Sequence, residues 1–230
     1  MVLGRLKLKQ LKNGKHNTRK GFNMKKMIRI AIGMALVSAL SVSAQTLKNF
    51  KSKPGEDTKA RVEGTSNIHD WYVEGKLISG ILNIDEAALG KAGKAAAEVK
   101  VIIPVKSLHS SSGAKMDDVM WEHMDVDKGG DNMKIQYILE ELTVKKPAAG
   151  NAAAECDSKG SLIIHGVTNK IDMPITIQKV EDDNLKIVGE VKLKITAFNI
   201  KPPSPALAMG LIKTGDDIKV IINWRVAPVK

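Results

Sequence analysis

Hydrophobic and polar residues alternate with a period of two along much of the chain. From Leu185 onward, Val191, Leu193 and Ile195 lie on one side of the pattern and the lysines between them lie on the other. This period is typical of β-strands with one dry face and one wet face. Six segments rich in Ile and Val, bounded by Gly, Asn, Asp or Pro, predict at least six strands: 98–105, 133–144, 161–165, 171–180, 185–197 and 218–226.

Helical patterns are short by comparison. Residues 86–97 are rich in alanine but contain two glycines, which predicts one turn of helix followed by a loop. Residues 115–125 form the better helix, because Met116, Met120 and Met124 recur every four residues on one face. Strands separated by turn signals favour an all-β antiparallel sandwich or barrel over a parallel α/β sheet, with one or two short helices added.

The methionine-rich face of the 115–125 helix has two interpretations. Methionines at this spacing usually pack a helix onto a core. Methionine also forms adaptable surfaces for irregular apolar ligands. If the sheet closes into a barrel of about eight strands, the interior can hold one small ligand, and this helix could close one mouth.

Residues 24–44 have the three features of a secretory signal peptide. A short cationic segment is followed by an apolar stretch over residues 30–40, and then by small residues that end at Ala44. We therefore expect export to the periplasm or to the outside of the cell, with cleavage after Ala44. The apolar stretch is shorter than the ~20 residues that a membrane span needs, so a retained anchor is the weaker alternative.

Translation could start at Met1 or at Met24. A signal counted from Met24 has an ordinary length, which favours residues 1–23 as an upstream extension of the reading frame. Residues 45–57 are polar and interrupted by a Pro-Gly pair, so they are predicted to be an N-terminal linker. One domain is expected over residues 58–230.

Most of the formal net charge of +11 comes from the leader, residues 1–44. Ten of the 36 cations lie in residues 1–44, which contain no Asp or Glu, so the rest of the chain has 26 cations against 25 anions. A basic nucleic-acid-binding surface is therefore not expected. Aromatic residues make up only 3% of the chain, too few for base-stacking platforms. The near-neutral charge of the chain after the leader and the low aromatic content both exclude nucleic acid as the expected partner.

Few residues suggest catalysis or metal binding. Cys156 is the single cysteine, which excludes an intrachain disulfide and any cysteine-based metal site, and leaves either a reactive thiol or an ordinary one. The histidines that follow the leader are scattered and lack the spacing of a metal motif. Ser111 or Ser112 is better interpreted as an N-terminal helix cap than as a nucleophile. No cofactor and no metal are expected.

Two alternatives to a ligand-binding barrel stay open. A hydrolase or isomerase would need His69, Asp70 or His165 to converge beside a pocket. An interaction module would have a barrel filled by side chains and an exposed apolar patch on its outer face.

Short motifs follow one another along the chain: Gly64 to Trp71 (GTSNIHDW), Gly160 to Lys170 (GSLIIHGVTNK) with Met173-Pro174-Ile175, Thr196 to Pro203 (TAFNIKPP), and Gly215 to Val220 (GDDIKV). In this order they resemble the YceI-like family, over residues 58–227. The resemblance implies an exported, lipocalin-like antiparallel β-barrel whose long apolar tunnel holds a polyisoprenoid or a related amphiphilic chain. It implies no catalytic residues.

The leading hypothesis is therefore an exported, non-enzymatic protein that binds an apolar or amphiphilic lipid inside a barrel of about eight strands. Burial at about 0.8 kcal/mol per methylene favours binding of a chain of about ten or more carbons without a charged anchor. No stable membrane insertion is expected after cleavage, and the oligomeric state, monomer or dimer, is left open. Alternation does not fix which face of a strand points inward. The residues predicted to line the tunnel are Met120, Trp121, Ile163, Ile175, Ile177, Val191, Leu193 and Ile195.

Overall fold

The strands predicted from alternation form one antiparallel sheet that closes on itself. The computed structural model describes residues 46–204 and 211–230. The predicted reading-frame extension, signal peptide and cleavage site lie outside the described residues. Within the described part of the chain, no helix has the length and apolarity of a membrane span.

The described residues contain twelve strands, one α-helix and six short 3-10 helices. The strands are β1 (Lys48–Ser52), β2 (Lys59–Ser66), β3 (Asp70–Gly75), β4 (Ser79–Ile84), β5 (Gly93–Ala95), β6 (Ala97–Pro104), β7 (His109–Ser110), β8 (Lys134–Lys146), β9 (Ala154–Ile164), β10 (Val167–Lys179), β11 (Leu185–Lys194) and β12 (Thr214–Pro228). The helices are α1 (Ala114–His123), η1 (Glu86–Gly90), η2 (Val105–Ser107), η3 (Val126–Lys128), η4 (Gly130–Met133), η5 (Glu181–Asp183) and η6 (Ile195–Phe198).

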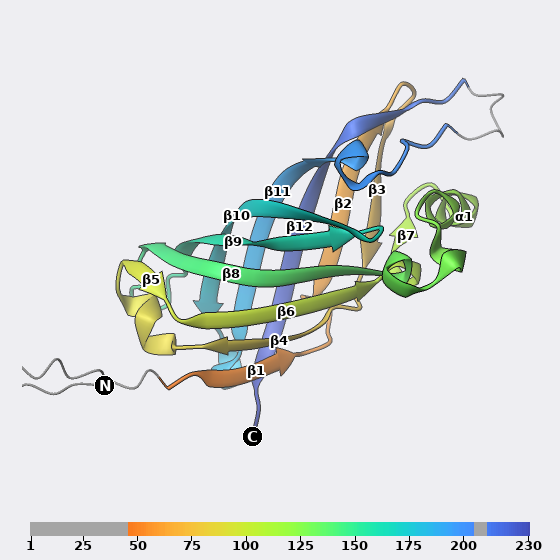
Figure 1. Cartoon of the computed structure of the whole chain (residues 1–230). Helices are drawn as coiled ribbons and strands as arrows, with labels where there is room; N and C mark the ends of the chain where they lie inside the picture. The colour runs from red at the N-terminus through yellow and green to blue at the C-terminus, as the bar shows by residue number, and fades with distance from the viewer. Residues whose placement is uncertain (1–45, 205–210) are drawn as a thin grey trace, which may run out of the picture. The chain divides into compact units, whose positions relative to one another are not determined.

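Eight strands form the barrel wall in the order β1-β4-β6-β8-β9-β10-β11-β12, and each is antiparallel to its neighbours. β12 pairs back to β1, with Phe50 opposite Pro228 and Ser52 opposite Val226, which closes the ring. Closure removes the unpaired edges that an open sheet would expose. The prediction of an all-β antiparallel barrel with short helices is confirmed (Figure 1).

Three neighbouring strands of the wall, β1, β4 and β6, are interrupted. Beyond the interruption the wall continues as β2, β3 and β7. β12 pairs with β2 through residues 214–223 and with β1 through residues 226–228, while β2 pairs with β3 and β3 with β7. At Gly75, beside one interruption, an added Cβ would lie 2.4 Å from the carbonyl oxygen of Ser107, so the two backbones approach too closely for a side chain. The interrupted strands extend the wall toward α1, which lies at this end of the barrel (Figure 1).

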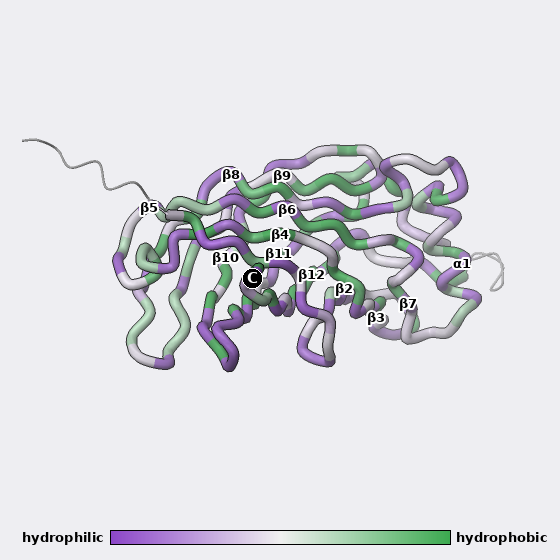
Figure 2. The backbone as a smooth tube through the Cα atoms, turned by 90° about the horizontal axis from the view of Figure 1, so that it is seen from below, coloured by the Kyte–Doolittle hydropathy of each residue, from purple (hydrophilic) through white to green (hydrophobic). Residues whose placement is uncertain are grey.

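Apolar and polar residues alternate along the strands, as the hydropathy colouring of the backbone tube shows (Figure 2). The inward set forms two apolar clusters. The first includes Phe50 and Val226, which are fully buried where β1 meets β12. The second includes Val126 of η3 and Phe198 of η6. Burial of these faces is the main contribution to stability.

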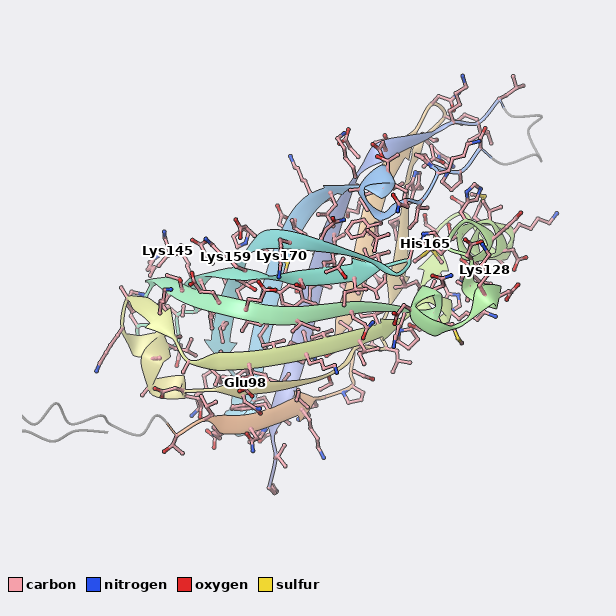
Figure 3. The ribbon with its side chains drawn as sticks, in the orientation of Figure 1. Glu98, Lys128, Lys145, Lys159, His165 and Lys170 are labelled. Carbon is pink, nitrogen blue, oxygen red and sulfur yellow. The ribbon has the colours of Figure 1, made fainter. Side chains whose placement is uncertain are left out.

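The outer face is charged and solvated. Lys145, Lys159 and Lys170 are exposed and project from β8, β9 and β10 (Figure 3). Lys170 pairs with Glu140 across the sheet, and similar pairs recur around the barrel. Exposed pairs of this kind contribute about 0–1 kcal/mol each, so they add little to what the interior supplies.

The predicted linker over residues 45–57 is wrong for residues 48–52, which form β1. β1 pairs with β4 on one side and with β12 on the other, and Phe50 at its centre is fully buried. A strand of five residues shows too little alternation to be recognised from the sequence. Its stability comes from two partners that are distant along the chain.

Two local predictions also differ from the structure. The residue before α1 is Gly113, with a φ of 93°, and no side chain caps the helix. Ser111 accepts a hydrogen bond from the Tyr72 amide instead, which fastens the loop to β3. The loop predicted after the helical turn near residue 86 contains β5, because residues 93–95 pair with β8.

The burial of Phe50 predicts that β1 is essential to the fold. Phe50→Ala should lower the free energy of unfolding by about 3–5 kcal/mol, because it leaves a cavity at the closure of the barrel. Lys51→Ala, on the exposed face of the same strand, should change it by less than about 0.5 kcal/mol. Urea denaturation of both variants measures the difference. Equal, small effects would show that residues 48–52 are dispensable, as a linker would be.

Candidate functional site

The interior of the barrel contains a cavity of about 430 Å³. Inward-facing side chains of β2, β3, β4, β6 and β8 to β12 form its wall together with α1. Small-molecule sites typically have volumes of ~300–1,000 Å³. The interior is thus hollow, unlike the filled barrel of the interaction-module alternative.

No Lys, Arg, Asp or Glu among the described residues lines the cavity. Most of the wall consists of Ile, Val, Leu and Met, because the inward positions of the strands carry the apolar half of each alternating pattern. Apolar cavities stay dry and accept apolar molecules such as hydrocarbons. The wall therefore favours a ligand that is uncharged along its buried length.

Five of the eight residues predicted to line the tunnel line this cavity: Met120, Ile175, Ile177, Val191 and Ile195. Trp121 and Leu193 pack against the second apolar cluster and do not line the cavity. The part that each residue takes in ligand binding stays a prediction.

The prediction that Ile163 points into the tunnel is wrong. Leu162 and Ile164 are 7% and 8% exposed and line the cavity, so Ile163 between them lies on the outer side of β9. Three consecutive apolar residues contain no alternation. The sequence therefore gave no basis for choosing between the two faces at this point.

The sequence-based prediction missed the contribution of β12. Its alternate residues Ile218, Val220, Ile222 and Trp224 line the cavity along much of its length. Polar residues, Lys219 and Asn223, occupy two of the three positions between them, so the period-two signal used for β10 and β11 would also have identified this face.

Polar side chains gather where the wall meets α1, β7 and the turn between β2 and β3. We call this set the polar rim: Ser66, His69, Ser110, Ser112 and His123, all of which line the cavity. His69 and Ser112 are also exposed to solvent. The cavity therefore reaches solvent at the polar rim, where a polar head group could lie.

One polar pair lies within the apolar wall. The Tyr137 hydroxyl of β8 and the Ser158 hydroxyl of β9 are 2.5 Å apart, and both residues line the cavity. Burial raises the pKa of Tyr137, so its phenol stays protonated over the physiological pH range. Neither residue was singled out from the sequence, because a serine and a tyrosine on different strands give no local signal.

The residues of the enzyme alternative do not form one cluster. His69 lines the cavity, whereas Asp70 lines a groove on the outer surface, as expected for neighbours in an extended chain. His165 lines neither. Among the described residues, no group of three or more His, Cys, Asp or Glu side chains could hold a metal ion.

His165 connects three segments near α1. Its Nδ1 is 3.2 Å from the Phe198 carbonyl oxygen and its Nε2 is 3.1 Å from Oδ2 of Asp125 (Figure 3). Both partners are acceptors, and which ring nitrogen donates depends on the tautomer. The pKa of Asp125 is lowered by hydrogen bonds from Lys128 and, second, from His165. This arrangement fastens the β9–β10 turn to η3 and η6.

Cys156 lies in the first apolar cluster, where it is 2% exposed. Burial, with a smaller effect of Asp157, raises the pKa of its thiol to about 11. The thiolate is the reactive form of cysteine. Of the two interpretations drawn from the sequence, the buried environment favours the ordinary thiol.

Comparison with protein families matches residues 50–226 to the YceI-like domain. Among the solved structures that share the fold are the following two. BcnA of Burkholderia cenocepacia is 20% identical, with a TM-score of 0.52, over 73% of this chain and 96% of that one. A polyisoprenoid-binding domain from Saccharophagus degradans, implicated in plant cell wall breakdown, is 12% identical, with a TM-score of 0.58, over 80% of this chain and 99% of that one. No curated protein matches the chain.

The raised pKa of Cys156 predicts a thiol that is inert in the folded protein. At pH 8 a pKa of about 11 leaves a thiolate fraction roughly two hundredfold lower than that of an ordinary cysteine. Alkylation by iodoacetamide should therefore be slower by at least that factor in the native protein than in urea. Mass spectrometry of labelled samples measures both rates. Equal rates would contradict the buried placement of the thiol.

Proposed function

The chain belongs to the YceI-like family, and from this premise we propose that it is an exported, non-enzymatic protein that holds a polyisoprenoid or another long-chain amphiphilic lipid in its barrel. The observation that carries the proposal is the apolar cavity of about 430 Å³, which has no charged side chain among its described lining residues and reaches solvent at the polar rim. The fold shared with the Saccharophagus degradans domain supports the same class of ligand.

The chemistry of the cavity accounts for binding without an ionic anchor. Each buried methylene contributes about 0.8 kcal/mol, so a chain of about ten carbons gains ~8 kcal/mol before the costs of association. A charged head group would lose its hydration inside an apolar wall, so it belongs at the polar rim or in solvent. Length and shape of the chain then set selectivity.

A binding role accounts for more of the structure than catalysis does. The candidate groups His69, Asp70 and His165 do not line one common pocket, and His165 already contacts Asp125 and the Phe198 carbonyl. General acid–base catalysis requires such groups to converge on one reacting atom. Ligand storage or transport requires only the enclosed apolar space.

Adjacent residues of β11 provide a test of lipid binding in the cavity. Val191→Trp places an indole inside the cavity and should weaken binding of geranylgeraniol at least tenfold, because the indole occupies ligand space. Lys192→Trp adds the same group to the exposed face and should leave affinity unchanged. Displacement of a bound fluorescent dye measures affinity, and circular dichroism checks that both variants fold.

Two results would count against lipid binding. Equal affinities for the two variants would place the ligand outside the cavity. Native mass spectrometry of protein purified from its own host without detergent should show a bound lipid, and reproducibly empty protein would overturn the proposal.

Export can be tested on the full chain expressed in a bacterium with a periplasm. The periplasmic fraction should contain protein that begins at Gln45, because cleavage is expected after Ala44. Ile32→Lys interrupts the apolar stretch and should abolish this product, while Leu8→Lys in the proposed upstream extension should not. N-terminal sequencing identifies the product. Uncleaved protein confined to the cytoplasm would contradict export.

A further inference from the structure

Away from the polar rim, Tyr137 and Ser158 form a polar pair within the apolar wall of the cavity. The hydroxyl oxygens of the two side chains are 2.5 Å apart, and Ser158 is 2% exposed. Tyr137 packs against both apolar clusters, so its ring lies between them rather than at the polar rim. A hydroxyl in this environment costs free energy unless it forms hydrogen bonds.

The backbone of β9 provides the space that the phenol occupies. Gly160 is the inward-facing position after Ser158, and an added Cβ there would lie 2.6 Å from the Tyr137 hydroxyl oxygen and 2.7 Å from its Cζ. The ring therefore fills the volume that a side chain at residue 160 would take. Ser158, Gly160 and Tyr137 thus form a fitted group whose polar end is fixed in place.

The hydrogen bonds of this pair are incomplete. Two hydroxyls carry two protons, and the bond between them uses one. No other described residue bonds to either oxygen atom. One O–H group therefore has no protein acceptor, although it lies in the wall of an apolar cavity. Ionisation of the phenol does not remove the unpaired proton, because burial raises the pKa of Tyr137.

We infer that the Tyr137–Ser158 pair donates a hydrogen bond to a neutral oxygen, a carbonyl or a hydroxyl, on the buried part of the ligand. This inference rests on the proposed function and narrows its ligand class. The favoured ligand is a long apolar chain that carries an oxygen away from the polar rim, and a pure hydrocarbon of equal length binds less tightly. Burial strengthens the preference, because an unpaired donor in an apolar wall costs more than one in water.

Matched probes separate the hydrogen bond from hydrophobic burial. Heptadecane and a series of heptadecanones, with the ketone moved along the chain, are each used to displace a bound fluorescent dye. In the wild-type protein the best-placed ketone should bind about fivefold or more tightly than heptadecane. In Tyr137→Phe/Ser158→Ala, which keeps the ring over Gly160 and removes both hydroxyls, the ratio should fall to about one. Tyr72→Phe, at an exposed tyrosine outside the cavity, should keep the wild-type ratio.

Infrared spectroscopy gives a second readout that needs no variant. The carbonyl stretch of the best-placed ketone, labelled with ¹³C, should shift to lower frequency on binding to the wild-type protein, as a hydrogen-bonded carbonyl does. A bound ketone with an unshifted stretch, or equal affinities for ketone and heptadecane, would overturn the inference and leave the proposed function intact. Failure of every probe to displace the dye would instead reject lipid binding itself.

Discussion

The pairing of β1 with β12 closes the sheet, and the cavity, the polar rim and both apolar clusters depend on that closure. In an open sheet the dry faces would need another layer to cover them, and two strand edges would be exposed. In a closed sheet the dry faces meet one another. Phe50 is fully buried at the closure, so a strand of five residues supports the arrangement of the whole wall.

The distribution of large side chains explains why the barrel is hollow. Eight-stranded barrels have just enough interior to be filled by side chains or to hold one small ligand. Here the buried aromatic residues are Phe50 and Trp224 in the first cluster and Phe198 in the second, while aliphatic side chains line most of the cavity. Two clusters packed in this way, with few aromatic residues in the chain to fill the remainder, leave space for a ligand.

Two polar arrangements among the described residues differ in how completely their hydrogen bonds are formed. His165 is largely enclosed, and its ring nitrogens lie within hydrogen-bond distance of Asp125 and of the Phe198 carbonyl, which fastens segments near the polar rim. Tyr137 and Ser158 bond to each other and retain one proton without a protein acceptor. In the first arrangement both ring nitrogens face protein oxygens, whereas in the second one hydroxyl proton has no protein acceptor and the pair faces the cavity. That difference is the physical basis for assigning the hydroxyl pair to the ligand.

The sequence by itself determined most of the strands and which of their residues share a face, because alternation with a period of two groups residues on one side of a strand. Ile175 and Ile177 share a face of β10 for this reason, but only the structure showed that this face lines the cavity. Ile163 lies in a run of apolar residues, so alternation did not indicate its face. The alternating segment of β1 is too short to identify it as a strand. Only the tertiary structure decided the closure of the barrel, the size of the cavity and the approach of Tyr137 to Ser158. The closure depends on pairing between β1 and β12, which lie far apart along the chain, and the approach of Tyr137 to Ser158 depends on the register between β8 and β9. The pattern within one strand carries no information about its partner or register.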